Sequence, residues 1–386
     1  MCGVGVLGGG DYLTFVSGSG HADGMADTSD TMSDTMRAAV YVGDRKVEVQ
    51  ERPVPEVGPN DVLLEVSHCG ICGSDLHFVI EGWGRVGAIE GHEYTGTVAA
   101  VGREVTGWSV GDEVVGGPSP RCGACEFCLA GRPSLCSGRG AVGERDDPWQ
   151  GAFADYIKVP EGQLLRVPDG LSLRDAALAE PLAVALHGIT RSGVAPGQRA
   201  LVTGGGPIGA LSVAALLAMG VTDVVVSEPA ETRRALCERL GARVVEPESL
   251  TTPASPNYLV DEPFDVALEC SGNAHAMEAA LAQLKRTGVL VLVGAGMRSP
   301  RFDPNRILLN ELMITGAFCY DAGGFEAALE LLARADFPTE LLVERDDVGL
   351  DGLLGAIEGL SAGEIPAKVL VAPARTEART RAGTGG

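Results

Sequence analysis

Four cysteines lie close together in the chain, as Cys122-Gly-Ala-Cys125-Glu-Phe-Cys128 followed by Cys136. The spacing C-x2-C-x2-C-x7-C lets one compact loop supply four thiolates to a tetrahedral zinc ion, at about 2.3 Å from each sulfur. Disulfides or unrelated thiols are the alternative, but cysteines three residues apart in a chain without an export signal favour a metal. Four protein ligands close the coordination sphere, so the spacing predicts a structural zinc.

A second set of metal-ligating residue types lies upstream. Cys72 stands in the run G-I-C-G-S-D-L-H, and His92 is followed directly by Glu93. Thiolate and imidazole are ligands that suit zinc. Glu180, in the run E-P-L, offers a further carboxylate. Three protein ligands and one open position would make this zinc a Lewis acid rather than a structural ion.

A glycine-rich motif, G-G-G-P-I-G, begins at Gly204. It follows a predicted strand and opens a predicted helix, and Glu228 ends the next predicted strand 19 residues past Gly209. This context indicates a dinucleotide-binding fold, in which the glycines let the backbone approach a pyrophosphate at a helix N-terminus. The residues predicted to contact the cofactor are Gly204, Gly206, Pro207, Ile208, Gly209, Glu228 and Arg233.

Glu228 also bears on which dinucleotide binds. A carboxylate at this position accepts hydrogen bonds from the ribose hydroxyls and repels the additional phosphate of NADP, so the sequence favours NAD. Arg233 and Arg234 lie just downstream, and they keep NADP as the alternative.

The elements that must position these residues follow two patterns. Up to residue 168 the chain has short β-branched runs between glycines and prolines (37–42, 62–66, 97–101 and 112–115), which predicts an irregular β core. After Glu180, predicted strands at 200–203, 224–227, 244–245, 266–269, 289–293 and 313–315 alternate with helices. Such alternation predicts a doubly wound parallel sheet. A helix at 325–333 and a strand at 368–371 are predicted to return the chain to the first region.

The ends of the chain differ in composition from the rest. Residues 1–36 contain five aspartates and neither lysine nor arginine, lack the features of a signal peptide, and are predicted to be disordered. Met32 or Met36 is the predicted natural start, and residues 375–386 are predicted to be a disordered tail. The domains are predicted at 37–180, 181–318 and 319–374, the last belonging to the first domain.

The bulk properties exclude some classes of partner. The 386 residues suffice for two cores, and the net charge of −22 argues against nucleic acid and anionic membranes. The longest uncharged run, 201–222, begins with the glycine turn and leaves about 13 helical residues, or roughly 20 Å, against a hydrocarbon core of about 30 Å. We therefore expect a buried helix there, no membrane span, and a cytoplasmic location.

Taken together, the motifs resemble a known family. Over residues 37–372 the chain is similar to the zinc-dependent medium-chain alcohol dehydrogenases, through G-I-C-G-S-D-L-H, G-H-E-Y-T-G-T-V, the four cysteines and G-G-G-P-I-G. The resemblance implies an α/β protein with a GroES-like β-rich catalytic domain and a Rossmann doubly wound domain. It also implies two zinc ions per subunit, one catalytic and one structural, and a homodimer or homotetramer.

The resemblance assigns roles to individual residues. Cys72 and His92 correspond to ligands of the catalytic zinc. Ser74 corresponds to the hydroxyl that touches the substrate oxygen, and His77 to the outer member of a proton relay. Asp75 corresponds to a residue that orients His92, which agrees with the general rule that a metal-bound imidazole donates its other N–H to a partner.

Either of two glutamates could be the third protein ligand of this zinc. Glu180 stands where many members have a cysteine, and the run E-P-L-A-V-A-L-H resembles the polyol, threonine and butanediol dehydrogenase branch. In that branch Glu93 or Glu180 can complete the zinc shell, and we expect the two to exchange. Lys368 corresponds to a position that often contacts the cofactor.

The implied reaction is a reversible transfer of hydride between NAD and a secondary alcohol or polyol, including vicinal diols and hydroxy-amino acids. The zinc would favour the alkoxide, and the proton would leave through Ser74, the ribose and His77. An NADP-dependent carbonyl reductase with the same site is one alternative. A non-catalytic nucleotide-binding protein of the same fold is the other.

Overall fold

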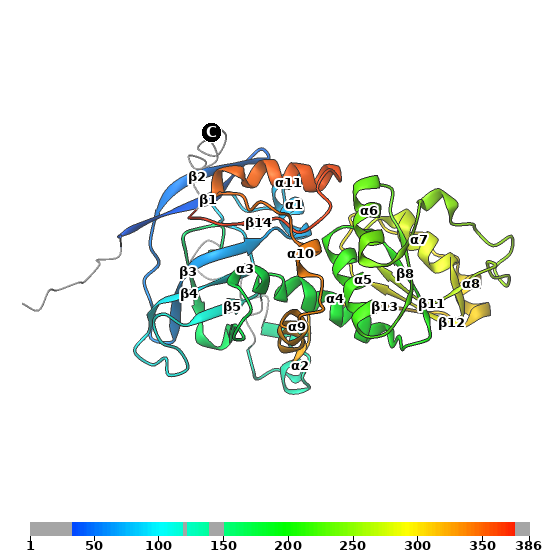
Figure 1. Ribbon diagram of the computed structural model, residues 1–386, viewed down its shortest axis with the longest axis horizontal. Helices are drawn as coiled ribbons and strands as arrows, with labels where there is room; N and C mark the ends of the chain where they lie inside the picture. Colours follow the sequence, from blue (N-terminus) through cyan, green and yellow to red (C-terminus); the bar gives the residue numbers. More distant parts are fainter. Residues whose placement is uncertain (1–32, 119–121, 139–149, 375–386) are drawn as a thin grey trace, which may run out of the picture. The chain divides into compact units, whose positions relative to one another are not determined.

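The computed structural model of the protein describes residues 33–118, 122–138 and 150–374 (Figure 1). The predicted disorder of residues 1–32 and 375–386 lies outside these ranges. The predicted extension 1–36 is too long, because strand β1 (Thr35–Gly43) already begins at Thr35 and Met36 is buried. Met36 alternates with Ala38 and Val40 on the side of the strand that faces the core. The polar residues before Met36 hide this alternation in the sequence.

The first region contains two antiparallel sheets, as the β-branched runs predict. Strand β1 pairs with β2 (Lys46–Pro53). The larger sheet has the order β14-β3-β4-β5-β7, with β6 also paired to β3. Its strands are β3 (Asp61–Gly70), β4 (Glu93–Val101), β5 (Glu113–Gly116), β6 (Tyr156–Pro160), β7 (Leu164–Arg166) and β14 (Leu370–Val371).

The second region contains a six-stranded parallel sheet of order β10-β9-β8-β11-β12-β13. The strand order reverses between β8 and β11, and dinucleotides bind at such a reversal, beyond the carboxyl ends of the strands. The strands are β8 (Arg199–Thr203), β9 (Asp223–Ser227), β10 (Arg243–Val245), β11 (Phe264–Glu269), β12 (Leu284–Leu292) and β13 (Met313–Gly316). All six predicted strands are confirmed.

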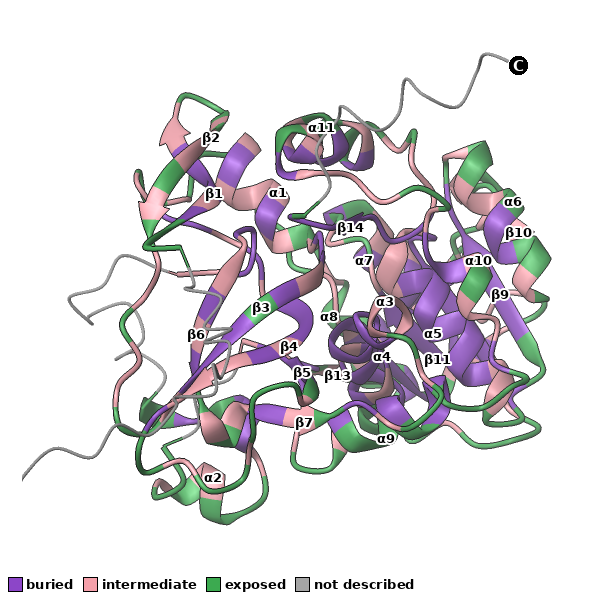
Figure 2. Cartoon of the chain, turned by 60° about the vertical axis from the view of Figure 1, so that its left-hand side comes forward, coloured by how far each residue is buried: buried purple, intermediate pink, exposed green. Residues whose placement is uncertain are grey.

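Each face of the parallel sheet carries its own core. Along β8, Val202 packs into a cluster with helices α4 (Ala179–Ser192), α5 (Pro207–Ala218) and α6 (Glu231–Leu240). Its neighbour Leu201 packs into a second cluster with α7 (Ala274–Ala282) and α8 (Pro304–Asn310). Successive residues of a strand point to opposite faces, so apolar residues at consecutive positions require helices on both sides. Figure 2 shows buried residues concentrated along α4 and α5.

Helix α5 confirms the expectation for the long uncharged run. It has 12 residues, and its residues from Gly209 to Leu216 are buried. Within the described part of the chain, none of the helices combines the length and the apolar character that crossing a bilayer requires.

The last part of the chain adds to both regions. Strand β14 pairs with Cys69 and Gly70 of β3, and α11 packs against α1 and β2. The predicted boundary at 180/181 falls in the first turn of α4, so a helix rather than a loop runs across it. The domain limits stay a prediction. The remaining helices are α1 (Gly73–Ile80), α2 (Glu126–Leu129), α3 (Leu173–Ala176), α9 (Gly324–Leu332), α10 (Thr339–Leu342) and α11 (Leu353–Ala362).

Candidate functional site

The pairing of β3 with β4 brings the predicted catalytic ligands together. Gly70, the last residue of β3, is paired with Glu93, the first residue of β4. Cys72 lies two residues beyond the end of one strand and His92 one residue before the start of the other. The ligand atoms of Cys72, His92 and Glu93 consequently lie within 4.8 Å of one another.

Local backbone structure fixes both sides of this group. Cys72 is the N-cap of α1, and its N–H donates to the Asp75 carboxylate at 2.8 Å, which holds the first helical turn in place. Gly91 has φ of 98°, and a Cβ there would lie 2.9 Å from both the Cys69 sulfur and the Phe153 nitrogen. Only glycine fits this turn, which directs His92 toward Cys72.

The surroundings of the group carry an excess of buried negative charge. Asp75 and Glu93 are fully buried, and Glu180 is 3% exposed. Burial raises the pKa of Asp75 to about 6, and burial together with the charge of Glu93 raises the pKa of Glu180 to about 7. A thiol, an imidazole and crowded carboxylates form a donor set that fits a divalent cation such as zinc.

Glu93 has a second partner, which is Lys368. The lysine is 1% exposed, and its ammonium lies 2.8 Å and 2.7 Å from the two Glu93 carboxylate oxygens. It also donates to the Ile71 carbonyl at 2.9 Å. Burial alone would lower the pKa of Lys368, but the charge of Glu93 outweighs it and raises the pKa. Lys368 therefore faces the metal-ligand group.

Ser74 and His77 follow Cys72 on α1. The Ser74 hydroxyl oxygen is buried and has no hydrogen-bond partner among the described residues. The imidazole of His77 lies beside Glu81, with 2.9 Å between Nδ1 and the carboxylate, and its ring stacks on Trp83. A buried hydroxyl without a partner costs free energy, so Ser74 is suited to bonding a ligand.

Asp75 lies near His92, but at a longer distance than the predicted orienting contact. Its free carboxylate oxygen is 4.0 Å from His92 Nδ1, too long for a hydrogen bond. Burial lowers the pKa of His92, but the thiol of Cys72 and then Asp75 outweigh this and raise it. Asp75 thus acts on His92 through charge in this structure, while its hydrogen bond goes to the Cys72 backbone.

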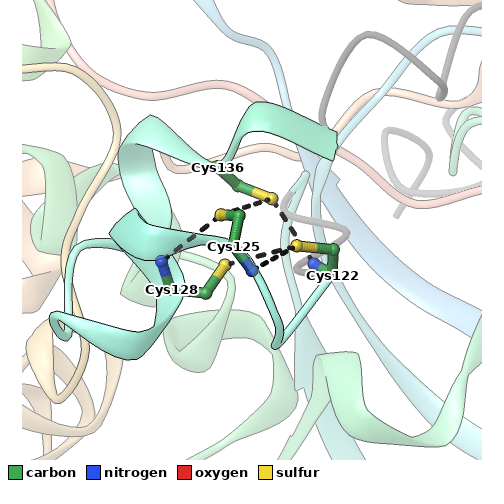
Figure 3. Close-up of side chains that lie close together, drawn as sticks. All are labelled: Cys122, Cys125, Cys128 and Cys136. Atoms are coloured by element: carbon green, nitrogen blue, oxygen red, sulfur yellow. Dashed lines mark hydrogen bonds between the residues drawn. The ribbon is translucent and has the colours of Figure 1, made fainter.

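The four cysteines of the predicted structural site converge at α2 (Figure 3). The sulfurs of Cys122 and Cys128 are 3.9 Å apart, and those of Cys125 and Cys136 are 4.0 Å apart. A tetrahedral ion with bonds of about 2.3 Å requires sulfurs separated by about 3.8 Å. Backbone N–H groups of Cys122, Cys125 and Cys128 donate to sulfurs of the group and stabilise their thiolate forms. The geometry fits one zinc ion.

The predicted cofactor turn lies at the reversal of strand order. Gly204 has φ of 92°, and a Cβ there would lie 2.8 Å from Ser271. A Cβ on Gly209 would lie 1.9 Å from the Gly204 carbonyl oxygen. Gly206 is the N-cap of α5, with Pro207 at its first position and Ile208 next. The free N–H groups of this helix end can receive a pyrophosphate.

The acid predicted to contact the ribose is held by this turn. Glu228 is 3% exposed and accepts hydrogen bonds from Gly205 N–H at 2.6 Å and Ala230 N–H at 2.8 Å. Arg233 donates to the Leu360 carbonyl at 2.7 Å. Arg234 donates to the carbonyls of Glu228 and Pro229 and lies 3.1 Å from Glu246. Arg234 is thus held at both ends of its guanidinium, whereas Arg233 keeps a buried Nε without a hydrogen-bond partner.

Two contacts of the site were not anticipated from the sequence. The Glu93–Lys368 pair joins residues 275 positions apart, and no sequence signal announces it. The contact between His77 and Glu81 has a signal, because residues at i and i+4 of a helix are neighbours. Of the aromatic residues at the site, Trp83 covers His77, whereas Phe153 is buried in the core.

Comparisons with known proteins agree with this geometry. The sequence profile described as "Alcohol dehydrogenase GroES-like domain" matches residues 58–169, and the profile described as "Zinc-binding dehydrogenase" matches residues 207–334. The chain is 34% identical to the sorbitol dehydrogenase of Bacillus subtilis over 340 residues. This alignment covers 85% of the chain and 94% of the relative.

Two solved structures extend the comparison. The 2R,3R-butanediol dehydrogenase of Bacillus subtilis is 30% identical, with a TM-score of 0.76 over 88% of this chain and 99% of that one. A protein from Sinorhizobium meliloti 1021, described as a zinc-binding dehydrogenase bound to NADP, is 31% identical. Its TM-score is 0.75, over 88% of this chain and 100% of that one.

The two ligand groups give a prediction about metal content. Purified protein should contain two zinc ions per chain by inductively coupled plasma mass spectrometry. Cys125→Ser should lose one ion and lower the melting temperature by at least about 5 °C, because the loop around α2 then lacks its crosslink. Cys72→Ser should lose the other ion with a smaller change in melting temperature.

The control for this measurement is Cys270→Ser, which lies in neither ligand group and should keep both ions. Loss of both ions in Cys125→Ser, or of neither, would contradict the assignment of two independent sites.

Proposed function

Because the chain belongs to the zinc-binding dehydrogenases with an alcohol dehydrogenase GroES-like domain, we propose that it oxidises a secondary alcohol or polyol with NAD, reversibly. The observation that carries the proposal is the group of Cys72, His92 and Glu93 beside the unpartnered hydroxyl of Ser74. Vicinal diols and polyols are the favoured substrate class, since the relatives include a sorbitol dehydrogenase and a butanediol dehydrogenase.

Two zinc ions per chain are proposed, one in each ligand group. In the catalytic group, Cys72 and His92 would be constant ligands, and Glu93 and Glu180 would exchange as the third. The Lys368 contact supports this exchange, because it offers Glu93 a partner of opposite charge whenever Glu93 leaves the metal. The buried carboxylate of Glu180 makes no ion pair with a described residue, and the charges of His92 and Lys368 lower its pKa only from a longer distance.

When bound, zinc supplies a Lewis acid that stabilises the negative charge on the substrate oxygen, and NAD accepts the hydride. The side chain of Ser74 would accept the hydroxyl proton of the substrate and pass its own proton outward. His77, one helical turn farther along α1, would receive the proton at the outer end of the path. Asp75 holds the Cys72 backbone, which fixes the position of the thiolate relative to Ser74.

NAD is proposed as the preferred cofactor. Glu228 lies buried against the glycine turn, where a 2′-phosphate would meet its charge. Arg233 and Arg234, the cations nearest in sequence, are bonded to protein carbonyls and to Glu246. An NADP-dependent carbonyl reductase is the second candidate, favoured by the NADP found in the Sinorhizobium meliloti relative.

A homodimer is proposed to form along the outer edge of β13. No strand pairs with this edge among the described residues, and Met313 on it is 59% exposed. Leu308 and Leu309 of the adjoining helix α8 are 71% and 55% exposed. A long apolar edge strand attracts another strand, and a two-fold axis lets two copies satisfy each other. A homotetramer would require a second contact surface between chains, in addition to the edge of β13.

A cytoplasmic location is also proposed. The described cysteines form no disulfides, and the metal-ligating ones must stay reduced to bind zinc.

The activity is tested by NADH formation with sorbitol, xylitol, 2,3-butanediol, threonine and simple alcohols. We expect turnover of a polyol or vicinal diol that a zinc chelator abolishes. Cys72→Ser should lower kcat at least about 1000-fold, since the metal is lost, and Ser74→Ala about 100-fold through the proton path. Affinity for NADH, followed by its fluorescence, should change little in either variant.

The matched control is again Cys270→Ser, which should keep wild-type turnover. Chelator-resistant turnover, or wild-type kcat in Cys72→Ser, would remove the basis of the proposed mechanism.

The cofactor preference is tested with Glu228→Ser. The ratio of kcat/KM for NAD to that for NADP should fall at least about tenfold, which corresponds to about 1.4 kcal/mol, because the repulsion of the 2′-phosphate is removed. Glu231→Gln, an exposed glutamate on α6, is the control and should leave the ratio unchanged. A wild-type preference for NADP would favour the second candidate.

The association is tested with Met313→Lys, measured by light scattering after gel filtration. The wild-type protein should have the mass of two or four chains, and the variant should have half the wild-type mass, because two lysines would meet at the two-fold axis. Met219→Lys, at an exposed site after α5, should retain the wild-type mass. Unchanged mass in Met313→Lys would place the interface elsewhere.

A further inference from the structure

Helix α1 and its C-cap carry three polar side chains in a line, and the proposed reaction uses only the first two. Ser74, His77 and Glu81 are spaced i, i+3 and i+7, so they lie along one side of the helix, whereas Asp75 and Val79 are its buried residues. The line begins next to Cys72 and ends at the partly exposed Glu81. A carboxylate at the outer end is not required by the reaction as described above.

We propose that Glu81 is a positioning residue for the proton path, which holds His77 in one ring orientation and takes its outer proton to solvent. The inference rests on the proposed function, because it presumes that His77 receives the substrate proton. It adds to that function the residue Glu81 and the route by which the proton leaves His77 for solvent.

The contacts of His77 fix its ring from two sides. Its Nδ1 atom lies 2.9 Å from the Glu81 carboxylate, and the indole of Trp83 stacks on the ring with a centroid distance of 5.0 Å and an interplanar angle of 18°. The chain after α1 folds back to place the indole, since Trp83 N–H donates to the His77 carbonyl at 3.3 Å. The imidazole therefore has little freedom to rotate.

This orientation determines which nitrogen accepts a proton. Nδ1 faces the Glu81 carboxylate at ion-pair distance but makes no hydrogen bond to it in this structure. Because an ionised carboxylate only accepts hydrogen bonds, its charge favours the tautomer with hydrogen on Nδ1, and Nε2 is then the basic nitrogen. A neutral His77 held in this way is ready to accept a proton from the side away from Glu81.

The transfer balances as one proton per turnover. The substrate hydroxyl proton would leave through Ser74 and reach His77 Nε2, which gives an imidazolium. The imidazolium then releases its Nδ1 proton to the Glu81 carboxylate, and water removes it from the half-exposed acid. After the release His77 carries its proton on Nε2, and proton exchange with water returns the starting tautomer. No electrons move in these steps, since the hydride leaves separately.

Other charged groups near this pair are few. Helix α11 packs against α1 and carries one titratable residue, the exposed Glu358. Tyr41 of β1 contacts the turn that follows Glu81, where a Cβ on Gly84 would lie 2.9 Å from its ring. Among the described residues, Glu81 is the charged side chain that lies within ion-pair distance of His77.

The test compares Glu81→Gln, which keeps the shape of the side chain, with Glu81→Asp, which keeps the charge. Glu358→Gln is the matched control, because it removes an exposed glutamate from the neighbouring helix. The imidazole resonances of the six histidines are followed by NMR as a function of pH in the zinc-loaded protein, and His77 is identified by their comparison with His77→Gln.

The spectroscopic readout does not depend on turnover. In Glu81→Gln the share of the tautomer with hydrogen on Nδ1 should fall, because the carboxylate no longer favours a donor on the nitrogen that faces it. Glu81→Asp should restore part of this share, and Glu358→Gln should leave it unchanged.

The kinetic readout has a defined sign. Alcohol oxidation needs a proton acceptor at the outer end of the path. Glu81→Gln should reduce the plateau kcat about three- to tenfold, because His77 loses the carboxylate that orients it and takes its proton. The KM for the alcohol should stay within about twofold.

The outcomes separate this inference from the proposed function. If His77→Gln alters the pH profile while Glu81→Gln matches the wild-type protein in both readouts, Glu81 has no role and only this inference fails. If the wild-type protein turns over no alcohol, the proposed function fails, and the tautomer measured by NMR still decides whether Glu81 orients His77. If Glu81→Gln merely lowers stability and leaves the tautomer and the plateau kcat in place, the positioning role is excluded.

Discussion

The catalytic ligand group depends on the balance of charge among the buried carboxylates that surround it. Asp75 and Glu93 are fully buried and Glu180 nearly so, and an unpaired buried charge costs several kcal/mol. Asp75 has the Cys72 N–H, and Glu93 has Lys368. Burial, and then the charge of Glu93, raise the pKa of Glu180 to about 7. A divalent cation beside Cys72 and His92 would supply the missing positive charge, so the same constraint that shapes the fold also favours the metal.

The backbone meets this constraint through the register of a few strands. Gly70 opposite Glu93 sets Cys72 and His92 side by side, and β14 alongside β3 brings Lys368 to them from the far end of the chain. A slip of one residue in either pairing would turn these side chains to the opposite face of the sheet. The tight turn at Gly91 and the close approach at Gly70, where a Cβ would lie 2.1 Å from the Glu93 carboxylate, leave no room for such slippage.

The sequence predicts the parts of this structure that depend on local patterns. Alternating strands and helices indicate the parallel sheet, and the glycine motif after β8 indicates where a dinucleotide would bind. The four cysteines are predicted by spacing alone. The start of β1 is misplaced by two residues, because polar composition hides a short alternation that ends in Met36. Lys368 could not be matched to Glu93, since that contact depends on β14 joining β3 and β4 in one sheet across 275 residues. The choice between Glu93 and Glu180 could not be made from the sequence either: both are buried carboxylates, but only Glu93 lies in the group with Cys72 and His92.

Helix α1 carries both the residues beside the proposed metal site and the residues at the outer end of the proton path. Its N-terminus lies at Cys72 and Ser74, where unpaired N–H groups stabilise the negative charge of a thiolate or of a substrate oxygen. Its C-terminus lies at His77 and Glu81, where the carbonyl groups stabilise a cation. Moving a proton from the first end to the second leaves negative charge where the helix favours it and creates an imidazolium where the helix favours that. Each end contributes about 0.3–1 kcal/mol. A helix of eight residues thus orients the ligand, the hydroxyl and the base, and also lowers the cost of separating their charges.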